Sequence, residues 1–285
     1  MRTPSWLIVA TLLGCHASID SSIDGPDPLG FDATVPDVPP ATTSAGCGMT
    51  HAGGQSNQQI VIGATTRTYI LTLPINYDPN TPLPLVFGWH GGGGSGVTLL
   101  DQGIVAASQD HIIAVHPNGL PVQSGATGWS LSPTGIDVAL FDALLANLES
   151  SLCVDTSRVF SYGYSFGGFM TNLLGCVRGD VLRAIAPFHG ALPGTLPACT
   201  GTVSAMLSNA MDDATVAIAD GVAAREAWRI SNSCSPTSAP VSPTPCVEYS
   251  GCQGQERVLW CLELSGGHPP PPDLATRAWS FLSGF

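Results

Sequence analysis

Short apolar runs alternate with longer stretches of helical periodicity along most of the chain after residue 80. Fully apolar runs of this kind are typical of strands that are buried on both faces of a sheet. Their alternation with helices indicates parallel strands joined by crossovers, so the sequence predicts an α/β protein with helices on both faces of a mostly parallel central sheet. The expected strands contain PLVFGW, HIIAVH, SRVFSYGY, LRAIAPF, VSAMLS and ERVLWCLEL, and the expected helices lie near residues 96–108, 136–152, 168–174 and 221–230 and in the C-terminal DLATRAWSFL.

The region before these runs has two other patterns. QQIVIGATTRTYILTLP alternates apolar and polar positions on both sides of a central Gly-Ala, which predicts a leading antiparallel hairpin. Residues 15–45 hold many Pro, Asp, Ser and Thr and few large apolar side chains, so they cannot repay the entropy of ordering a chain. We therefore expect a flexible tether over residues 15–45 and one folded domain over residues 46–285.

The first fifteen residues, MRTPSWLIVATLLGC, have the features of an export signal. Arg2 supplies a positive charge, and the apolar core of residues 6–13 is too short to span a bilayer. LLGC resembles the lipobox of bacterial lipoproteins, which predicts a signal peptide over residues 1–14 and a lipid on Cys15. By the same resemblance, His16 after the cysteine favours the outer membrane. The alternative is an ordinary secretory signal, and both readings predict an extracytoplasmic protein.

Composition narrows the possible partners. Apolar residues make up 44% of the 285 residues, which is enough for one sizeable core. Charged residues make up only 11%, the formal net charge is −12, and lysine is absent. Binding to phosphate backbones needs clustered Lys and Arg, so nucleic acid is excluded as a partner. We expect a monomer that acts on neutral or weakly charged substrates.

The cysteine count indicates disulfides. Of nine cysteines, Cys15 is assigned to the lipid, and an even number remains. In an exported chain an even number predicts disulfide bridges, here four. The alternative, a zinc site, lacks any C-x-x-C pair, so we expect no metal. The eight remaining positions are Cys47, Cys153, Cys176, Cys199, Cys234, Cys246, Cys252 and Cys261.

VFSYGYSFGGFM, residues 159–170, places a serine between glycines where an apolar strand gives way to a helix. Gly163 and Gly167 remove side chains that would collide where the strand and the helix cross. This strand–turn–helix predicts a nucleophile elbow that lifts Ser165 to the carboxyl end of the sheet. Phe166 then opens the helix, so its N–H is a candidate donor to an oxyanion. The alternative is a glycine-rich turn that only packs the helix on the strand.

VFGWHGGGGSG ends an earlier strand with His90 and four glycines. Backbone without side chains can bring N–H groups close to a reacting oxygen, and Gly91 and Gly92 are the candidate donors. We expect His90 to orient or pack this loop rather than to act as a base. A phosphate-binding loop is excluded because no Lys-Ser/Thr pair follows the glycines.

A serine nucleophile needs a base and an orienting carboxylate, which follow it in the order acid, then His. In the expected order the acid lies between the serine and the histidine. His189 comes before the candidate acids, so we expect a structural role for it. His268, in LELSGGHPPPP after the last strand, is the candidate base. The segment SNAMDDATV offers Asp212 and Asp213 as the acid.

With these residues in place, the chain resembles the secreted feruloyl esterases of the α/β-hydrolase superfamily, a group that also holds acetylxylan esterases and polyhydroxybutyrate depolymerase-like lipoproteins. The resemblance covers nearly all of residues 45–285. It departs from the family pattern where NAMDD replaces the usual H-G-x-x-D and in the four-glycine loop. The segments that carry it are SAGCG, RTYILTLPINYD, HPNGL, GW before DVALFDAL, LCVDTSRVFSYGYSFGGFMTNLLGC, AREAWRISNSC and YSGCQGQERVLWCLELSGGH.

The resemblance implies an α/β-hydrolase fold and a catalytic triad of Ser165, Asp213 and His268. It implies a cofactor-free serine esterase acting on feruloyl esters of plant cell-wall polysaccharide. The alternatives are a polyester depolymerase or an acetylxylan esterase, and, from another class, an inactive carbohydrate-binding lipoprotein. Trp89 and Trp129 could flank the substrate pocket, or they could pack in the core.

Two cysteine pairings can be suggested from the expected elements. Cys153 precedes a strand and Cys176 ends the helix that returns from it, so both lie at the same end of the sheet and could bond. A hairpin in CVEYSGCQGQERVLWC would set Cys246 opposite Cys261.

Overall fold

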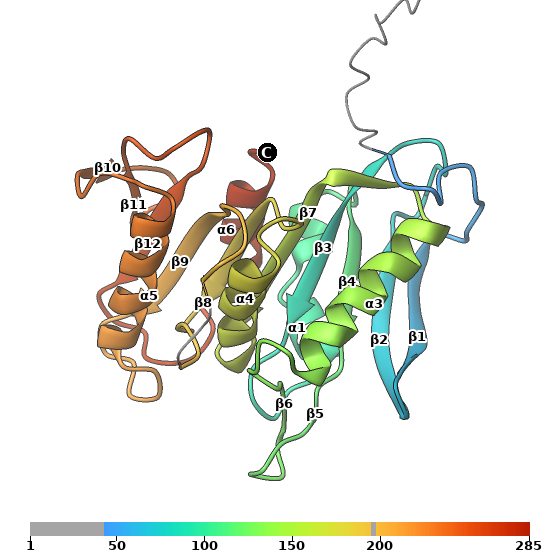
Figure 1. The fold of residues 1–285 in the computed structure, drawn as a ribbon, viewed down its shortest axis with the longest axis horizontal. Coiled ribbons are helices and arrows are strands. Elements are labelled where there is room, and N and C mark those ends of the chain that lie inside the picture. The colour runs from blue at the N-terminus through green and yellow to red at the C-terminus, as the bar shows by residue number, and fades with distance from the viewer. Residues whose placement is uncertain (1–42, 195–197) are drawn as a thin grey trace, which may run out of the picture. The chain divides into compact units, whose positions relative to one another are not determined.

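A computed structural model describes residues 43–194 and 198–285 of the chain (Figure 1). The signal peptide, Cys15 and nearly all of the tether predicted from the sequence lie outside these residues. Ser44, at the end of the predicted tether, is buried, and its N–H donates to the carbonyl oxygen of Val154. The packed part of the chain therefore includes residues just before position 46.

One ten-stranded sheet runs through the domain in the order β1-β2-β4-β3-β7-β8-β9-β12-β11-β10. The six strands from β4 to β12 in this order are parallel, and antiparallel strands flank them on both sides. The predicted leading hairpin is β1 and β2, which pair antiparallel. The parallel strands are β3 (Leu83–Trp89), β4 (Ile113–Pro117), β7 (Val154–Tyr164), β8 (Ala184–Phe188), β9 (Ser204–Ala210) and β12 (Val258–Glu263); the flanking strands are β1 (Gly54–Ile62), β2 (Thr65–Leu73), β10 (Ser238–Pro240) and β11 (Cys246–Tyr249); β5 (Leu120–Pro121) and β6 (Thr127–Gly128) form a separate ribbon.

Helices cover both faces of the sheet, as the sequence predicts (Figure 1). The side chains of α3 (Ile136–Ser151), α4 (Phe166–Val177) and α5 (Ile218–Ser231) join one apolar core. Those of α1 (Gly96–Leu100), α2 (Ile104–Ala107) and α6 (Leu274–Leu282) join a second core on the other face. Within the described residues, no helix is long and apolar enough to cross a membrane.

One predicted helix is wrong in its extent. The sequence predicts a single helix near residues 96–108, but the structure has two short helices, α1 and α2, in this stretch. Gly103 lies between them with φ of +94°, a left-handed conformation that ends one helix before the next begins.

Four disulfides form, as the cysteine count predicts: Cys47–Cys153, Cys176–Cys199, Cys234–Cys252 and Cys246–Cys261. Cys246 and Cys261 face each other across β11 and β12, so that predicted pairing is confirmed. The predicted Cys153–Cys176 pairing is wrong. The N-terminal segment packs on the start of β7, where Ser44 bonds Val154, and this brings Cys47 to Cys153. Several disulfides are typical of an extracytoplasmic protein.

Candidate active site

The candidate site residues lie just beyond the carboxyl ends of five strands that are neighbours in the sheet: β3, β7, β8, β9 and β12. Parallel strands end at one edge, so segments far apart in sequence meet there. The residues brought together at this edge are Gly91 after β3, Ser165 after β7, His189 after β8, Asp213 after β9 and His268 after β12.

Ser165 occupies a strained turn between β7 and α4. Its φ of +55° and ψ of −119° are rare for a residue with a side chain. A Cβ atom added at Gly163 would lie 2.3 Å from the carbonyl oxygen of Gly167, and one added at Gly167 would lie 1.8 Å from that of Trp89. Glycine is therefore required at both positions by close backbone approach, as the sequence predicts for a nucleophile elbow.

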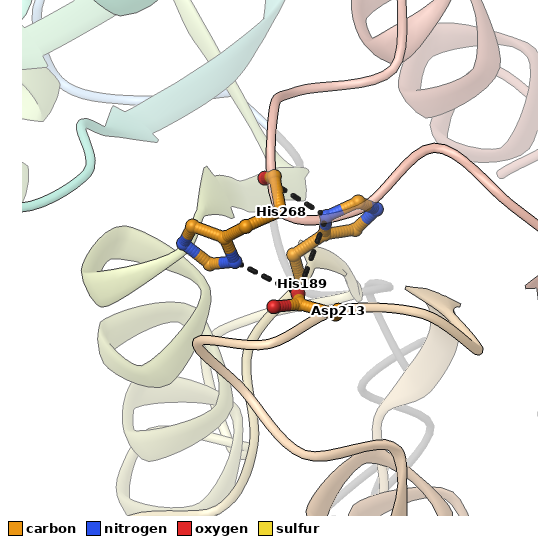
Figure 2. Close-up of side chains that lie close together, drawn as sticks. All are labelled: His189, Asp213 and His268. Carbon is orange, nitrogen blue, oxygen red and sulfur yellow. Dashed lines mark hydrogen bonds and ion pairs between the residues drawn. The ribbon is translucent and has the colours of Figure 1, made fainter.

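A continuous hydrogen-bond chain links the three predicted triad residues. The Ser165 hydroxyl lies 2.8 Å from Nε2 of His268, and Nδ1 of His268 lies 2.7 Å from Oδ2 of Asp213. Figure 2 shows the second of these contacts. With the proton on Nδ1, Nε2 of His268 has a free lone pair and can accept the serine proton. This arrangement can activate a hydroxyl for attack on an acyl carbon.

Asp213 is held in its ionised form. Its side chain is fully buried, and burial by itself would raise its pKa. Hydrogen bonds from His268 and from the backbone N–H groups of Val216 and Thr215 outweigh this effect and lower the pKa of Asp213. A buried carboxylate beside Nδ1 favours the tautomer of His268 that the chain of hydrogen bonds needs.

Asp212 has a different position from its neighbour. Its carboxylate is exposed and accepts the N–H groups of Gly267 at 2.8 Å and Gly266 at 3.2 Å. These two bonds lower the pKa of Asp212 and tie it to the loop that carries His268. Asp213, not Asp212, therefore faces the imidazole.

The glycine loop after β3 carries the N–H groups of Gly91 and Gly92, the candidate oxyanion donors. The N–H of Gly93 donates to Thr127 and that of Gly94 donates to the carbonyl oxygen of Gly91. Within the described residues, the N–H groups of Gly91 and Gly92 have no acceptor in hydrogen-bond range. His90 orients the loop, because its Nδ1 lies 2.7 Å from the Gly91 carbonyl oxygen and its Nε2 accepts the N–H of Gly119.

Comparison with known proteins gives the family. No protein-family model matches the chain. Feruloyl esterase D of Neurospora crassa is 31% identical in an alignment of 284 positions, which spans 89% of this chain and 94% of that protein. The chain belongs to the feruloyl esterase family. It is therefore a carboxylic ester hydrolase.

Solved structures confirm the α/β-hydrolase fold. An acetyl xylan esterase from Aspergillus awamori superposes with a TM-score of 0.60 at 15% identity, covering 75% of this chain and 94% of that one. A ferulic acid esterase from Anaeromyces mucronatus, solved with ferulic acid, superposes with a TM-score of 0.56 at 14% identity, covering 82% of this chain and 90% of that one.

The two tryptophans of this esterase lie beneath the glycine loop. Trp89 is 0% exposed and Trp129 is 2% exposed, and their rings meet edge to face with centroids 5.0 Å apart. The indole N–H of Trp89 donates to Ser161, and that of Trp129 donates to the carbonyl oxygen of His90. These positions fit the packing role that the sequence left open, with Trp129 supporting the loop from below.

A cavity of about 300 Å³ opens beside the glycine loop. Its size falls at the lower end of the range for small-molecule sites. One wall is backbone, and the other walls mix apolar and uncharged polar side chains. The lining is Gly91–Gly94, His90, Thr98, Leu99, Gln102, Tyr164 and Pro270.

Two residues near His268 have contacts that the sequence did not indicate: Tyr164 was not a candidate, and His189 was expected only to have a structural role. The Tyr164 hydroxyl donates to the carbonyl oxygen of His268, and Nδ1 of His189 lies 3.2 Å from the same oxygen. His189 is fully buried and has no contact with Ser165 in the hydrogen bonds of the described residues. No motif marks Tyr164, apart from its place directly before the elbow serine.

His189, Asp213 and His268 also form a group that could hold a metal ion, with ligand atoms within 4.8 Å of one another (Figure 2). In this group, Nδ1 of His268 already bonds Oδ2 of Asp213 at 2.7 Å. A metal ion would have to replace that bond. The arrangement therefore fits proton transfer better than it fits metal binding.

Behind His189, Glu263 is the most strongly perturbed carboxylate of the site. Burial would raise its pKa, but the nearby His189 and the hydrogen bonds from Arg277 and Ser208 lower the pKa of Glu263 from 4.5 to about 2. A lowered pKa contributes stability that is fully present above pH 4.5 and is lost as the pH falls towards 2. This shift corresponds to at most about 3 kcal/mol, and solvent screening at the exposed side of the carboxylate lowers the contribution below that value.

We expect Glu263→Gln to be less stable than the wild type near pH 6 and to show a flatter stability profile between pH 6 and pH 2. Urea denaturation across this range measures the effect. Glu226→Gln, which removes an exposed partner of Arg229, is the control and should keep the wild-type profile, because solvent screens that pair. Parallel profiles for wild type and Glu263→Gln would contradict the assignment.

Proposed function

We propose that Ser165, His268 and Asp213 hydrolyse esters through an acyl-enzyme. His268 takes the proton of Ser165 as the serine oxygen attacks the ester carbonyl carbon. The tetrahedral intermediate collapses when the C–O bond to the alcohol breaks and His268 protonates the leaving oxygen. Water then attacks the acyl-enzyme with His268 again as the base, releasing the acid and restoring the serine.

The hydrogen-bond chain from Ser165 through His268 to buried Asp213 is the observation that carries this proposal. The N–H groups of Phe166, at the start of α4, and of Gly91 or Gly92 are the oxyanion donors that we infer. The two glycine groups are suited to this role because they donate to no acceptor within the described part of the chain. A donor of this kind is worth about 3–4 kcal/mol of transition-state stabilisation.

For the substrate, we infer feruloyl and related hydroxycinnamoyl esters of plant cell-wall polysaccharide. The names of the relatives support an aromatic acyl group. The cavity beside the glycine loop supports it too, because Leu99, Tyr164 and Pro270 offer apolar contacts to a flat ring. Each arginine of the described residues lies within 4 Å of a carboxylate, so an uncharged substrate fits better than an anionic one.

We also infer that the enzyme works outside the cytoplasm as a monomer held to the membrane through a lipid on Cys15. The LLGC segment supports the lipid, and the disulfides support the compartment.

Rates on methyl ferulate, acetylated xylan and a soluble hydroxybutyrate oligomer test the substrate. We expect kcat/KM to be highest on methyl ferulate. A higher value on acetylated xylan or on the oligomer would reassign the acyl group while leaving the esterase chemistry intact. Absence of hydrolysis of all three and of p-nitrophenyl acetate would instead favour the non-enzymatic alternative, a carbohydrate-binding surface protein.

A further inference from the structure

The carbonyl oxygen of His268 accepts hydrogen bonds from two side chains. One donor is the hydroxyl of Tyr164, the residue directly before Ser165. The other is Nδ1 of His189, at 3.2 Å (Figure 2). A carbonyl oxygen can only accept, so Nδ1 of His189 carries the proton in this contact.

The two donors come from the ends of neighbouring strands, and His189 is itself held in place. His189 follows β8, is 0% exposed, and donates its backbone N–H to Ser208 at 2.7 Å. Its Nε2 has no hydrogen-bond partner within the described residues and faces Glu263 at 3.9 Å. The rings of Tyr164, His189 and His268 lie together, with centroids 5.4–6.0 Å apart.

The segment that carries His268 has little else to hold it. Gly266 and Gly267 have φ of +138° and +68°, and proline follows His268, so the segment belongs to no helix or strand. Asp212 fixes the two N–H groups before the histidine. Tyr164 and His189 fix its carbonyl group. A displaced peptide would displace the imidazole from Ser165, and an error of about 1 Å in a reacting group can cost about 100-fold in rate.

We propose that Tyr164 and His189 are positioning residues for ester hydrolysis, acting together on the main chain of His268 to keep its imidazole in register with Ser165 and Asp213. This inference rests on the proposed catalytic role of His268. The Tyr164 hydroxyl and the His189 imidazole act on the main chain of His268. The ring of Tyr164 lines the cavity, but Tyr164→Phe keeps that ring, so the loss of either donor affects kcat rather than KM.

Tyr164→Phe and His189→Phe each remove one donor and keep a ring. We expect each variant to lower kcat for methyl ferulate by about 10- to 100-fold, with KM changed less than about threefold. The rate at which a fluorophosphonate labels Ser165 should fall in parallel, because that reaction also needs His268 as the base. Active-site titration and thermal unfolding keep loss of folded enzyme separate from loss of rate.

Tyr162→Phe is the matched control for Tyr164→Phe. Tyr162 lies two residues earlier on β7, is buried, and its hydroxyl bonds Nε2 of His116 at 2.8 Å, away from the site. Removing this hydroxyl is expected to lower the unfolding temperature but to leave kcat and the labelling rate near those of the wild type.

His189→Asn and His189→Gln separate the donor from the ring. The amide nitrogen of asparagine takes the place of Nδ1 and can still reach the carbonyl oxygen of His268. That of glutamine takes the place of Nε2, which faces Glu263. We therefore expect Asn to recover at least tenfold in kcat over Phe, and Gln to recover little.

Wild-type kcat in either phenylalanine variant, or equal recovery by Asn and Gln, would overturn the proposal. So would an equal loss of kcat in Tyr162→Phe. These results are distinguishable from a failure of the triad assignment, which would appear as retained activity in Ser165→Ala, whatever the Tyr164 and His189 variants do.

Discussion

Ser165→Ala is expected to lower kcat/KM for ester hydrolysis by about 10⁵-fold or more. The proposed mechanism passes through a covalent bond between the serine oxygen and the acyl carbon, and alanine has no atom that can form it. The oxyanion donors and the cavity remain, so a small residual rate above that of water is expected. Steady-state rates on methyl ferulate measure the effect, and far-ultraviolet circular dichroism should be unchanged.

Ser161→Ala is the control for this variant. Ser161 lies on β7, the strand that leads to Ser165. It is buried and accepts the indole N–H of Trp89, so its loss tests whether removing a nearby buried hydroxyl affects the rate. We expect it to retain wild-type kcat. A Ser165→Ala enzyme that hydrolyses methyl ferulate within tenfold of the wild-type rate would refute the serine mechanism.

The second large effect concerns two adjacent aspartates. Asp213→Asn keeps the shape of the side chain but puts an amide where Nδ1 of His268 needs an acceptor. The imidazole then favours the tautomer with its proton on Nε2, which cannot accept the proton of Ser165. We expect a loss of about 10³- to 10⁴-fold in kcat near neutral pH.

Asp212→Asn makes the same chemical change one residue earlier. The asparagine side chain has one neutral oxygen, which can accept the N–H of Gly266 or of Gly267, whereas the carboxylate accepts both. The loop is therefore held less tightly. We expect a loss of less than about tenfold, because these bonds are exposed and water competes for them. Equal losses in the two variants, or a larger loss in Asp212→Asn, would contradict the assignment of Asp213 as the orienting acid.

Features that depend on local pattern could be predicted from the sequence. Apolar runs such as residues 113–117 and 184–188 are buried on both faces, and for that reason they read as parallel strands. The glycines around Ser165 predicted the elbow because steric exclusion between adjacent backbones allows no other residue there. The Cys246–Cys261 bridge could also be predicted from a local pattern, because a hairpin fixes which residues of its two strands face each other.

Features that depend on packing between distant segments could not be predicted. Cys153 pairs with Cys47 because residues 43–47 lie on the start of β7, and nothing in either segment specifies that contact. The contact of Tyr164 and His189 with the carbonyl of His268 joins three strand ends and involves a main-chain acceptor, which leaves no trace in residue types. Trp89 and Trp129 presented a similar ambiguity, because an aromatic ring suits a pocket wall and a core equally well.

In the inferred mechanism, the glycine wall of the cavity stabilises the reacting oxygen, and the other walls distinguish one acyl group from another. On that side the enzyme presents main-chain amides, which substitution cannot swap for another functional group. Variation in acyl preference must therefore come from the other walls, where Thr98 and Gln102 lie on a segment that carries none of the reacting atoms. Random libraries confined to these two codons should shift acyl preference among related esters while sparing turnover, which makes this edge of the molecule a natural starting point for directed evolution.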